Sequence, residues 1–169
     1  MKRSALAAAL LLLPTIAAAD LTKGQRELAL SGSGSNTREF NAGAVSATGD
    51  YGVYVNPHLE VGLRQTFSWS KSEDGGSTWS GATRVYTDYH YGSAEWRPYI
   101  GASIGISYGD DSDSTWFAGP EIGIKYYVQP AAFLFAQMEY QIFFGGTSEV
   151  LSRADEGAFY YSFGAGYNF

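Results

Sequence analysis

Hydrophobic residues alternate with small or polar residues along most of this chain. The clearest case is the last segment, where one parity is hydrophobic: Phe159, Tyr161, Phe163, Ala165, Tyr167 and Phe169. An alternation with a period of two predicts a β-strand that has one apolar face and one smaller, more polar face. The segment is also long enough for a tilted strand to cross a lipid bilayer.

Turn-forming residues divide the chain into eight such segments. The predicted strands are residues 25–34, 40–55, 59–70, 82–92, 97–108, 115–128, 131–144 and 157–169. Short connections (56–58, 93–96, 129–130) alternate with longer polar ones (71–81, 109–114, 145–156), and the even number places both termini at one end. This pattern predicts an all-β fold, an eight-stranded antiparallel up-and-down transmembrane β-barrel. Pro120 lies inside the sixth strand, where we expect a β-bulge.

The two faces of the predicted strands carry different chemistry. In the third strand Leu59, Val61 and Leu63 share one parity, whereas Glu60 and Arg64 share the other. A membrane barrel turns its apolar parity to lipid and its polar parity inward. Large aromatic residues gather near both ends of the strands, as the two interfaces of a bilayer select. We therefore expect Trp69, Tyr108, Trp116, Phe144 and Phe159 near the external ends, and Tyr89, Tyr91, Tyr126, Tyr167 and Phe169 near the periplasmic ends.

Charged residues collect on the inward parity and form a predicted interior polar network. Its members are Glu27, Glu60, Arg64, Arg84, Asp88, His90, Glu121, Lys125 and Glu139. An unpaired charge in a low-dielectric interior costs several kcal/mol, so we expect these residues to pair with one another. Eight strands enclose a space that side chains just fill.

The N-terminus has the pattern of a secretory signal peptide. Lys2 and Arg3 precede an apolar stretch over residues 5–13, and Ala17 to Ala19 supply the small residues of a cleavage site. We expect residues 1–19 to be the signal peptide and residues 20–169 to be the barrel domain. The chain has no cysteine and a net charge of −6, which excludes disulfides and disfavours nucleic-acid binding.

The terminal residues Tyr167 and Phe169, with aromatics two residues apart behind them, resemble the closing signal of bacterial outer-membrane β-barrels. The architecture resembles the eight-stranded OmpA and OmpX type, and this resemblance covers residues 20–169. It implies export through the periplasm to the outer membrane of a Gram-negative cell, and recognition of Tyr167 and Phe169 by the barrel-assembly machinery. It also implies contact with outer-membrane lipids and lipopolysaccharide, as a monomer without a cofactor.

Three functions are compatible with these residues. The first is a non-enzymatic envelope barrel with a filled polar interior and short acidic surface loops, and the second is a narrow ion-conducting pore gated by interior salt bridges. The third is an enzyme that modifies lipid A, because some eight-stranded outer-membrane barrels use histidine with serine for that chemistry. His90 shares its face with Asp88, which could orient it as a base. No serine motif accompanies His90, so we expect no enzymatic activity.

Two further features of the sequence receive simple interpretations. His58 lies in a predicted periplasmic turn, and we interpret it as a turn residue. Asp110, Asp111 and Asp113 form part of a Ca²⁺-loop pattern, but the glycine and the distal glutamate are missing. We therefore expect a solvated loop here and no metal site.

Overall fold

The structure, a computed structural model, describes residues 21–36, 42–72, 76–92, 95–110, 112–144 and 157–169. The predicted signal peptide (residues 1–19) and the whole predicted loop 145–156 lie outside these ranges. Among the described residues, no helix has the length and apolar character needed to cross a membrane.

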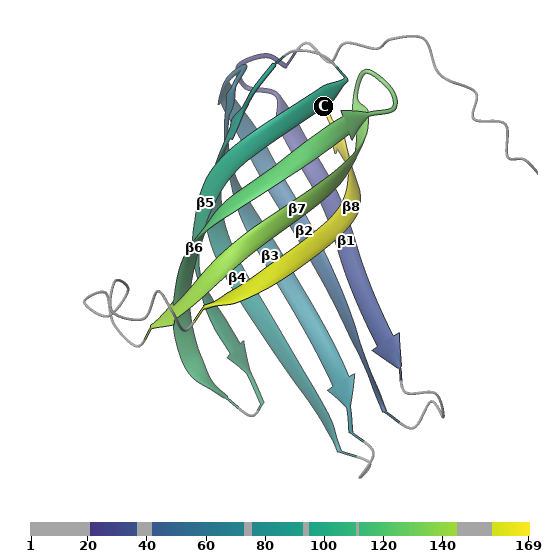
Figure 1. The fold of residues 1–169 in the computed structure, drawn as a ribbon, viewed down its shortest axis with the longest axis vertical. Helices are drawn as coiled ribbons and strands as arrows, with labels where there is room; N and C mark the ends of the chain where they lie inside the picture. Colours follow the sequence, from purple (N-terminus) through teal and green to yellow (C-terminus); the bar gives the residue numbers. More distant parts are fainter. Residues whose placement is uncertain (1–20, 37–41, 73–75, 93–94, 111, 145–156) are drawn as a thin grey trace, which may run out of the picture.

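Eight antiparallel strands form a closed barrel in chain order (Figure 1). They are β1 (Arg26–Asn36), β2 (Gly43–Asn56), β3 (Leu59–Lys71), β4 (Ser77–His90), β5 (Trp96–Gly109), β6 (Ser112–Tyr127), β7 (Ala132–Phe144) and β8 (Ala158–Asn168). Each strand pairs with its neighbour in sequence, and β8 pairs with β1 to close the ring. The predicted fold class is therefore confirmed.

Two predicted connections are shorter in the structure than in the sequence-based prediction. Strand β4 begins at Ser77, five residues before the predicted start, because the ladder with β3 continues through Trp69 opposite Trp79. Only residues 110 and 111 separate β5 from β6, in place of the predicted loop 109–114. Serine, threonine and glycine in these segments gave a loop-like composition, but cross-strand pairs such as Ser70–Thr78, with their hydroxyl oxygens 2.8 Å apart, stabilise a strand.

The β2–β3 turn is held by a side chain. The amides of His58 and Leu59 donate hydrogen bonds of 2.8 and 2.9 Å to the Asn56 side-chain oxygen. An asparagine side chain that accepts from the backbone two residues later is a common turn device. His58 is therefore a turn residue, as predicted, and its ring stacks on Tyr89.

The expected bulge at Pro120 is not present. The β6–β7 register is the same on both sides of it, because Ala118 lies opposite Ile142 and Glu121 opposite Glu139. Instead the ladder to β7 is interrupted at Gly119 and Pro120, where proline supplies no N–H. Gly119 permits this close approach, because a Cβ there would collide with the backbone carbonyl of β7.

The β1–β8 seam is the shortest joint in the barrel wall. Five residues of β1, from Glu27 to Ser31, are paired with β8, whereas β1 pairs with β2 over its full length. Arg26 and Phe169 extend this seam by two reciprocal backbone hydrogen bonds of 2.9 Å. Towards the other end of the barrel, β1 and β8 run apart (Figure 1).

The predicted faces are present in the structure. Apolar side chains such as Leu63, Ile104 and Phe163 are exposed on the outer wall, whereas charged side chains on the other parity are buried. Trp69, Trp116, Phe159, Tyr89, Tyr91, Tyr167 and Phe169 are exposed near the strand ends. Phe144 differs from the prediction, since it is only 2% exposed opposite Trp116.

Candidate functional site: the buried polar interior

The first interior group, which we call the Lys125 cluster, lies at the end of the barrel that holds the termini. The Lys125 ammonium donates to both carboxylate oxygens of Glu27 (2.6 and 2.8 Å) and to Glu60 Oε2 (2.9 Å). The Tyr54 hydroxyl donates to Glu27 at 2.9 Å. His90 Nε2 lies 3.0 Å from the same Glu60 oxygen. One ammonium thus joins carboxylates from β1 and β3.

The second group, the Arg64 cluster, lies one level further along the barrel. Arg64 Nε donates to Asp50 (2.9 Å), and its Nη1 atom donates to Glu121 (2.9 Å). Its Nη2 atom also donates to the side-chain oxygen of Gln137 at 3.1 Å. Every nitrogen of this guanidinium therefore has an acceptor, which is the arrangement that a buried arginine requires. The cluster connects β2, β3, β6 and β7 across the barrel.

The third group is the Arg84–Glu139 pair, which lies further from the termini. Arg84 Nη1 donates to Glu139 Oε2, and Nη2 donates to the Thr66 hydroxyl at 2.8 Å. The Ser103 hydroxyl donates to the other Glu139 oxygen at 2.6 Å. Glu139 Oε2 is also 3.9 Å from Arg64 Nη1, so the two arginines share one carboxylate.

The nine residues of the predicted network all lie in the barrel interior, each at most 8% exposed. Eight of them belong to the three groups above. Asp88 is also buried, and its Oδ1 atom has no hydrogen-bond partner among the described residues. The sequence pattern thus located these side chains, but the pairing follows from the register and the barrel closure.

Several interior residues were not part of the prediction. Asp50 belongs to the Arg64 cluster, and Arg97 is buried beside the ring of Tyr127. The sequence contained a signal for both, because each lies on the inward parity of its strand. Large rings that were not part of the predicted network also fill the interior: Tyr54, Tyr86, Tyr99, Phe117, Tyr127, Phe133 and Phe135.

His90 is placed by Glu60 and not by Asp88. Its ring is fully buried between Tyr54 and Tyr99, with centroid distances of 5.4 and 5.1 Å. Glu60, Asp88 and His90 could together hold a metal ion, since one ligand atom from each lies within 4.8 Å of the others. The Lys125 ammonium already bonds to the Glu60 oxygen that faces His90, and it supplies the positive charge there.

The space between the clusters is small. The cavity bounded by Arg64, Tyr86, Tyr99 and Lys125 has a volume of about 10 Å³, which is about the space that one water molecule needs. At this level the described side chains therefore fill the barrel. The predicted external and terminal residues lie outside this interior: Asp110 and Phe169 are exposed, Asp111 lies outside the described residues, and the Asp113 side chain is not described.

Comparison with known proteins supports the fold. Three solved structures match over most of their length. The N-terminal β-barrel domain of Pseudomonas aeruginosa OprF has a TM-score of 0.59 and 18% identity, covering 88% of this chain and 100% of that one. The outer membrane protein OprG from Pseudomonas aeruginosa has a TM-score of 0.57 and 14% identity, covering 88% and 97%. Neisserial surface protein A has a TM-score of 0.56 and 16% identity, covering 86% and 96%.

No protein-family model matches the sequence, and no curated protein matches it either. The similarity to solved structures is low in sequence and high in coverage, so it shows the fold. This fold is the eight-stranded barrel of outer-membrane proteins, and it agrees with the predicted outer-membrane location.

Proposed function

We propose that this chain is a non-enzymatic integral barrel of the Gram-negative outer membrane, closed by an interior plug of paired charges. The observation that carries the proposal is the continuity of the three groups. Lys125, Arg64 and Arg84 each contact carboxylates on other strands, so ion pairs connect opposite walls at three levels. The small central cavity agrees with a plug, because hydrated ions need a continuous water path.

The outer wall supports a location in the membrane. Exposed apolar side chains on several strands would be unfavourable in water but favourable against lipid. A water-soluble barrel would carry its charges outside, whereas here six carboxylates and four cationic side chains are buried. The contacts with outer-membrane lipids and lipopolysaccharide follow from this location. Recognition of Tyr167 and Phe169 by the assembly machinery, and the monomeric state, are proposed with it.

A narrow, gated ion-conducting pore is the second candidate function. The observation in its favour is Glu139, which bonds to Arg84 and also lies 3.9 Å from Arg64 Nη1. Besides Asp50, which its Nε atom binds, Arg64 thus has Glu139 within a small side-chain movement of its present partner Glu121. An arginine that exchanges these two partners would change the width of the interior without a backbone movement.

Conductance in planar lipid bilayers distinguishes these two functions. The plug predicts that the refolded native chain shows no discrete openings. The gate predicts discrete openings of the native chain whose lifetime changes in Arg64→Lys, which keeps the charge but loses the forked geometry. Arg26→Lys is the matched control, because Arg26 is exposed at the barrel end. Discrete openings of the native chain would contradict the plug.

The proposal of a non-enzymatic protein rests on the position of His90. Its ring is fully buried in the Lys125 cluster, at the end of the barrel that holds the termini. A lipid A substrate would approach from the outer leaflet at the opposite end. The test is the mass spectrum of lipid A from cells with and without the gene. An acyl-chain difference that disappears in His90→Ala would contradict the proposal.

A further inference from the structure

The half of the barrel away from the termini is hollow. A cavity of about 380 Å³ and one of about 230 Å³ share Ser46, Ser68 and Ser80 in their walls. A third, of about 110 Å³, shares Thr66 and Arg84 with the second. We call these three neighbouring spaces the vestibule.

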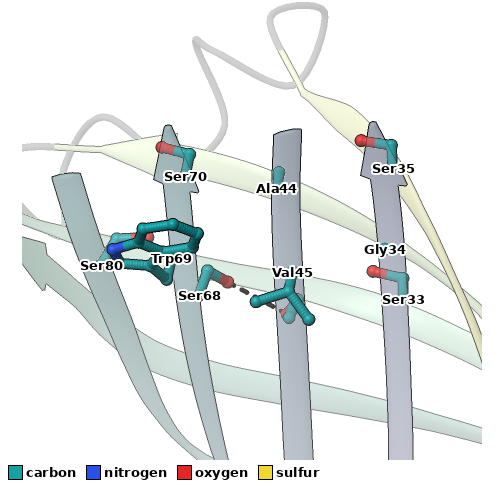
Figure 2. Close-up of a pocket in the computed structure, with 10 residues that line it drawn as sticks. Ser33, Gly34, Ser35, Ala44, Val45, Ser68, Trp69, Ser70 and Ser80 are labelled. Atoms are coloured by element: carbon teal, nitrogen blue, oxygen red, sulfur yellow. Dashed lines mark hydrogen bonds between the residues drawn. The ribbon is translucent and has the colours of Figure 1, made fainter. Parts of the chain in front are cut away.

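One side of the vestibule carries serine hydroxyl groups, together with the exposed side chains of Val45 and Trp69. Ser33 and Ser35 on β1 and Ser68 and Ser70 on β3 line its larger cavity (Figure 2). Some hydroxyls bond to one another, as in the 3.0 Å hydrogen bond from Ser68 to Ser46. Because each hydroxyl has one donor and two acceptor sites, such a pair can still bind a further polar group.

The other side of the same space carries aromatic rings. Phe117, Phe143 and Tyr160, from β6, β7 and β8, line the cavity that also contains Ser46 and Ser68. The Phe117 and Phe143 rings pack against each other, with their centroids 5.7 Å apart. The vestibule therefore has a row of serine hydroxyl groups on one side and a cluster of aromatic rings on the other.

The floor of the vestibule is formed by the Arg84–Glu139 pair. Arg84 is 8% exposed and lines two of the three cavities. Its Nε–H group has no acceptor among the described residues, which is costly for a buried donor. Of the described residues that line the vestibule, only Arg84 and Glu139 carry charge, and they neutralise each other. The floor thus offers one hydrogen-bond donor that has no acceptor, the Arg84 Nε–H group. The Arg84–Glu139 pair as a whole carries no net charge.

We propose that the vestibule binds a neutral sugar ring from outside the cell. A pyranose has hydroxyl groups at its edge and C–H groups on its faces. Its edge matches the serine hydroxyls, and its C–H face matches the rings of Phe143 and Tyr160, which are more exposed than Phe117. Neutral walls and a neutral floor favour an uncharged ligand, because a charged one would lose its hydration without a partner. This binding would add to the proposed function as an envelope barrel.

NMR titration of the isotope-labelled native chain tests this proposal. The protein is refolded in a phosphocholine detergent, because a detergent with a sugar head group would compete for the site. Methyl β-glucoside and methyl β-galactoside are the probes, and sorbitol is the control ligand, since it has hydroxyls but no ring face. We expect at least one glycoside to cause saturable shifts near Ser46 and Ser68, with a dissociation constant on the order of 1 mM. In a saturation-transfer experiment, we expect magnetisation to pass from the protein to the C–H protons of the sugar ring.

Two variants test the two walls. Phe143→Leu keeps an apolar side chain but removes the flat ring, and the double variant Ser68→Ala with Ser80→Ala removes two hydroxyls. Each is expected to weaken glycoside binding about fivefold to tenfold, the effect of losing one or two weak contacts. Phe163→Leu and Thr87→Val are the matched controls, because both side chains are exposed on the outer wall. Gel mobility before and after boiling checks that each variant forms a barrel.

Three results would overturn the proposal. One is the absence of saturable shifts with both glycosides, and another is an equal response to sorbitol. The third is an equal loss of binding in Phe163→Leu and Phe143→Leu. None of these results would affect the plug, which is tested separately by conductance.

Discussion

Lys125 is the residue that compensates the charge of two buried carboxylates. Its ammonium is shared by Glu27, Glu60 and the Tyr54 hydroxyl, which come from β1, β3 and β2. Among the described residues, Lys125 is the only permanently charged cation that forms an ion pair with Glu27 or Glu60, since the other partner is the His90 ring. The loss of this ammonium would leave two buried carboxylates without a compensating charge.

Lys125→Met is therefore expected to destabilise the barrel by about 3–5 kcal/mol, the usual cost of removing one partner from a buried ion pair. The measurement is reversible urea unfolding in lipid vesicles. Lys71→Met is the matched control, because Lys71 is exposed at the end of β3, and its effect should stay within about 0.5 kcal/mol. Equal effects of the two substitutions would show that the Lys125 cluster does not stabilise the barrel.

The direction of a charged side chain could be predicted from the sequence, but its partner could not. Parity placed Glu60, Arg64 and Lys125 inside, because an alternating strand has only two faces. The contact between Lys125 and Glu27 joins residues 98 positions apart, and it exists only after the ring closes. Aromatic side chains were less informative, because both lipid and a tightly filled interior accept large rings. Tyr54 and Phe133 point inward for this second reason.

Among the neighbouring strands of the barrel, β1 and β8 have the fewest residues paired with each other. The Phe169 amide donates to the Arg26 carbonyl, and the Asn168 amide donates to Ala131. Since successive amides of a strand point to opposite sides, the odd-numbered amides of β8 face β1. Beyond the last registered pair, Ser31 with Gly164, these amides have no β1 partner in the ladder.

We therefore expect the amides of Phe159, Tyr161 and Phe163 to exchange with deuterium faster than those of Ala165 and Tyr167. The measurement is hydrogen exchange by NMR on the refolded barrel. The internal control is the even-numbered set in the same strand, Tyr160 and Ser162, which face β7 and are registered with it. Equal protection of the odd-numbered amides along all of β8 would show that the seam is closed over its full length.

The number and order of the strands could be predicted, whereas two of their ends could not. Turn residues and alternation identified all eight elements, because each hairpin is local in sequence. The start of β4 depends instead on cross-strand contacts such as the stacked rings of Phe67 and Trp79, 6.0 Å apart. The uninterrupted register at Pro120 was also not predictable, because it depends on Gly119 and on the close backbone of β7.

For the molecule as a whole, the free-energy cost of placing a charged residue on the outer wall depends on whether that wall faces water or lipid. Ile104 lies near the middle of β5, and its side chain is 48% exposed. In water an exposed isoleucine tolerates replacement by arginine, but at the centre of a bilayer an arginine on the lipid face costs about 2–4 kcal/mol.

Ile104→Arg should therefore destabilise the refolded barrel by about 2–4 kcal/mol in lipid vesicles, as measured by urea unfolding. Ser77→Arg is the comparison, because Ser77 is exposed at the first position of β4 and should lie near or beyond the interface. Its expected cost is about 0–1 kcal/mol. If both substitutions had the same small effect, the outer wall would not face hydrocarbon.

The short β1–β8 seam also has a consequence for the order in which the barrel is assembled. Every other strand pair joins neighbours in the chain, so each hairpin can form with little loss of chain entropy. The seam joins Glu27 to Asn168, and its closure requires the two ends of the domain to meet. Long-range pairing of this kind is slow. We infer that ring closure is the last and slowest step of folding, and that the joint formed last is also the one with the fewest paired residues.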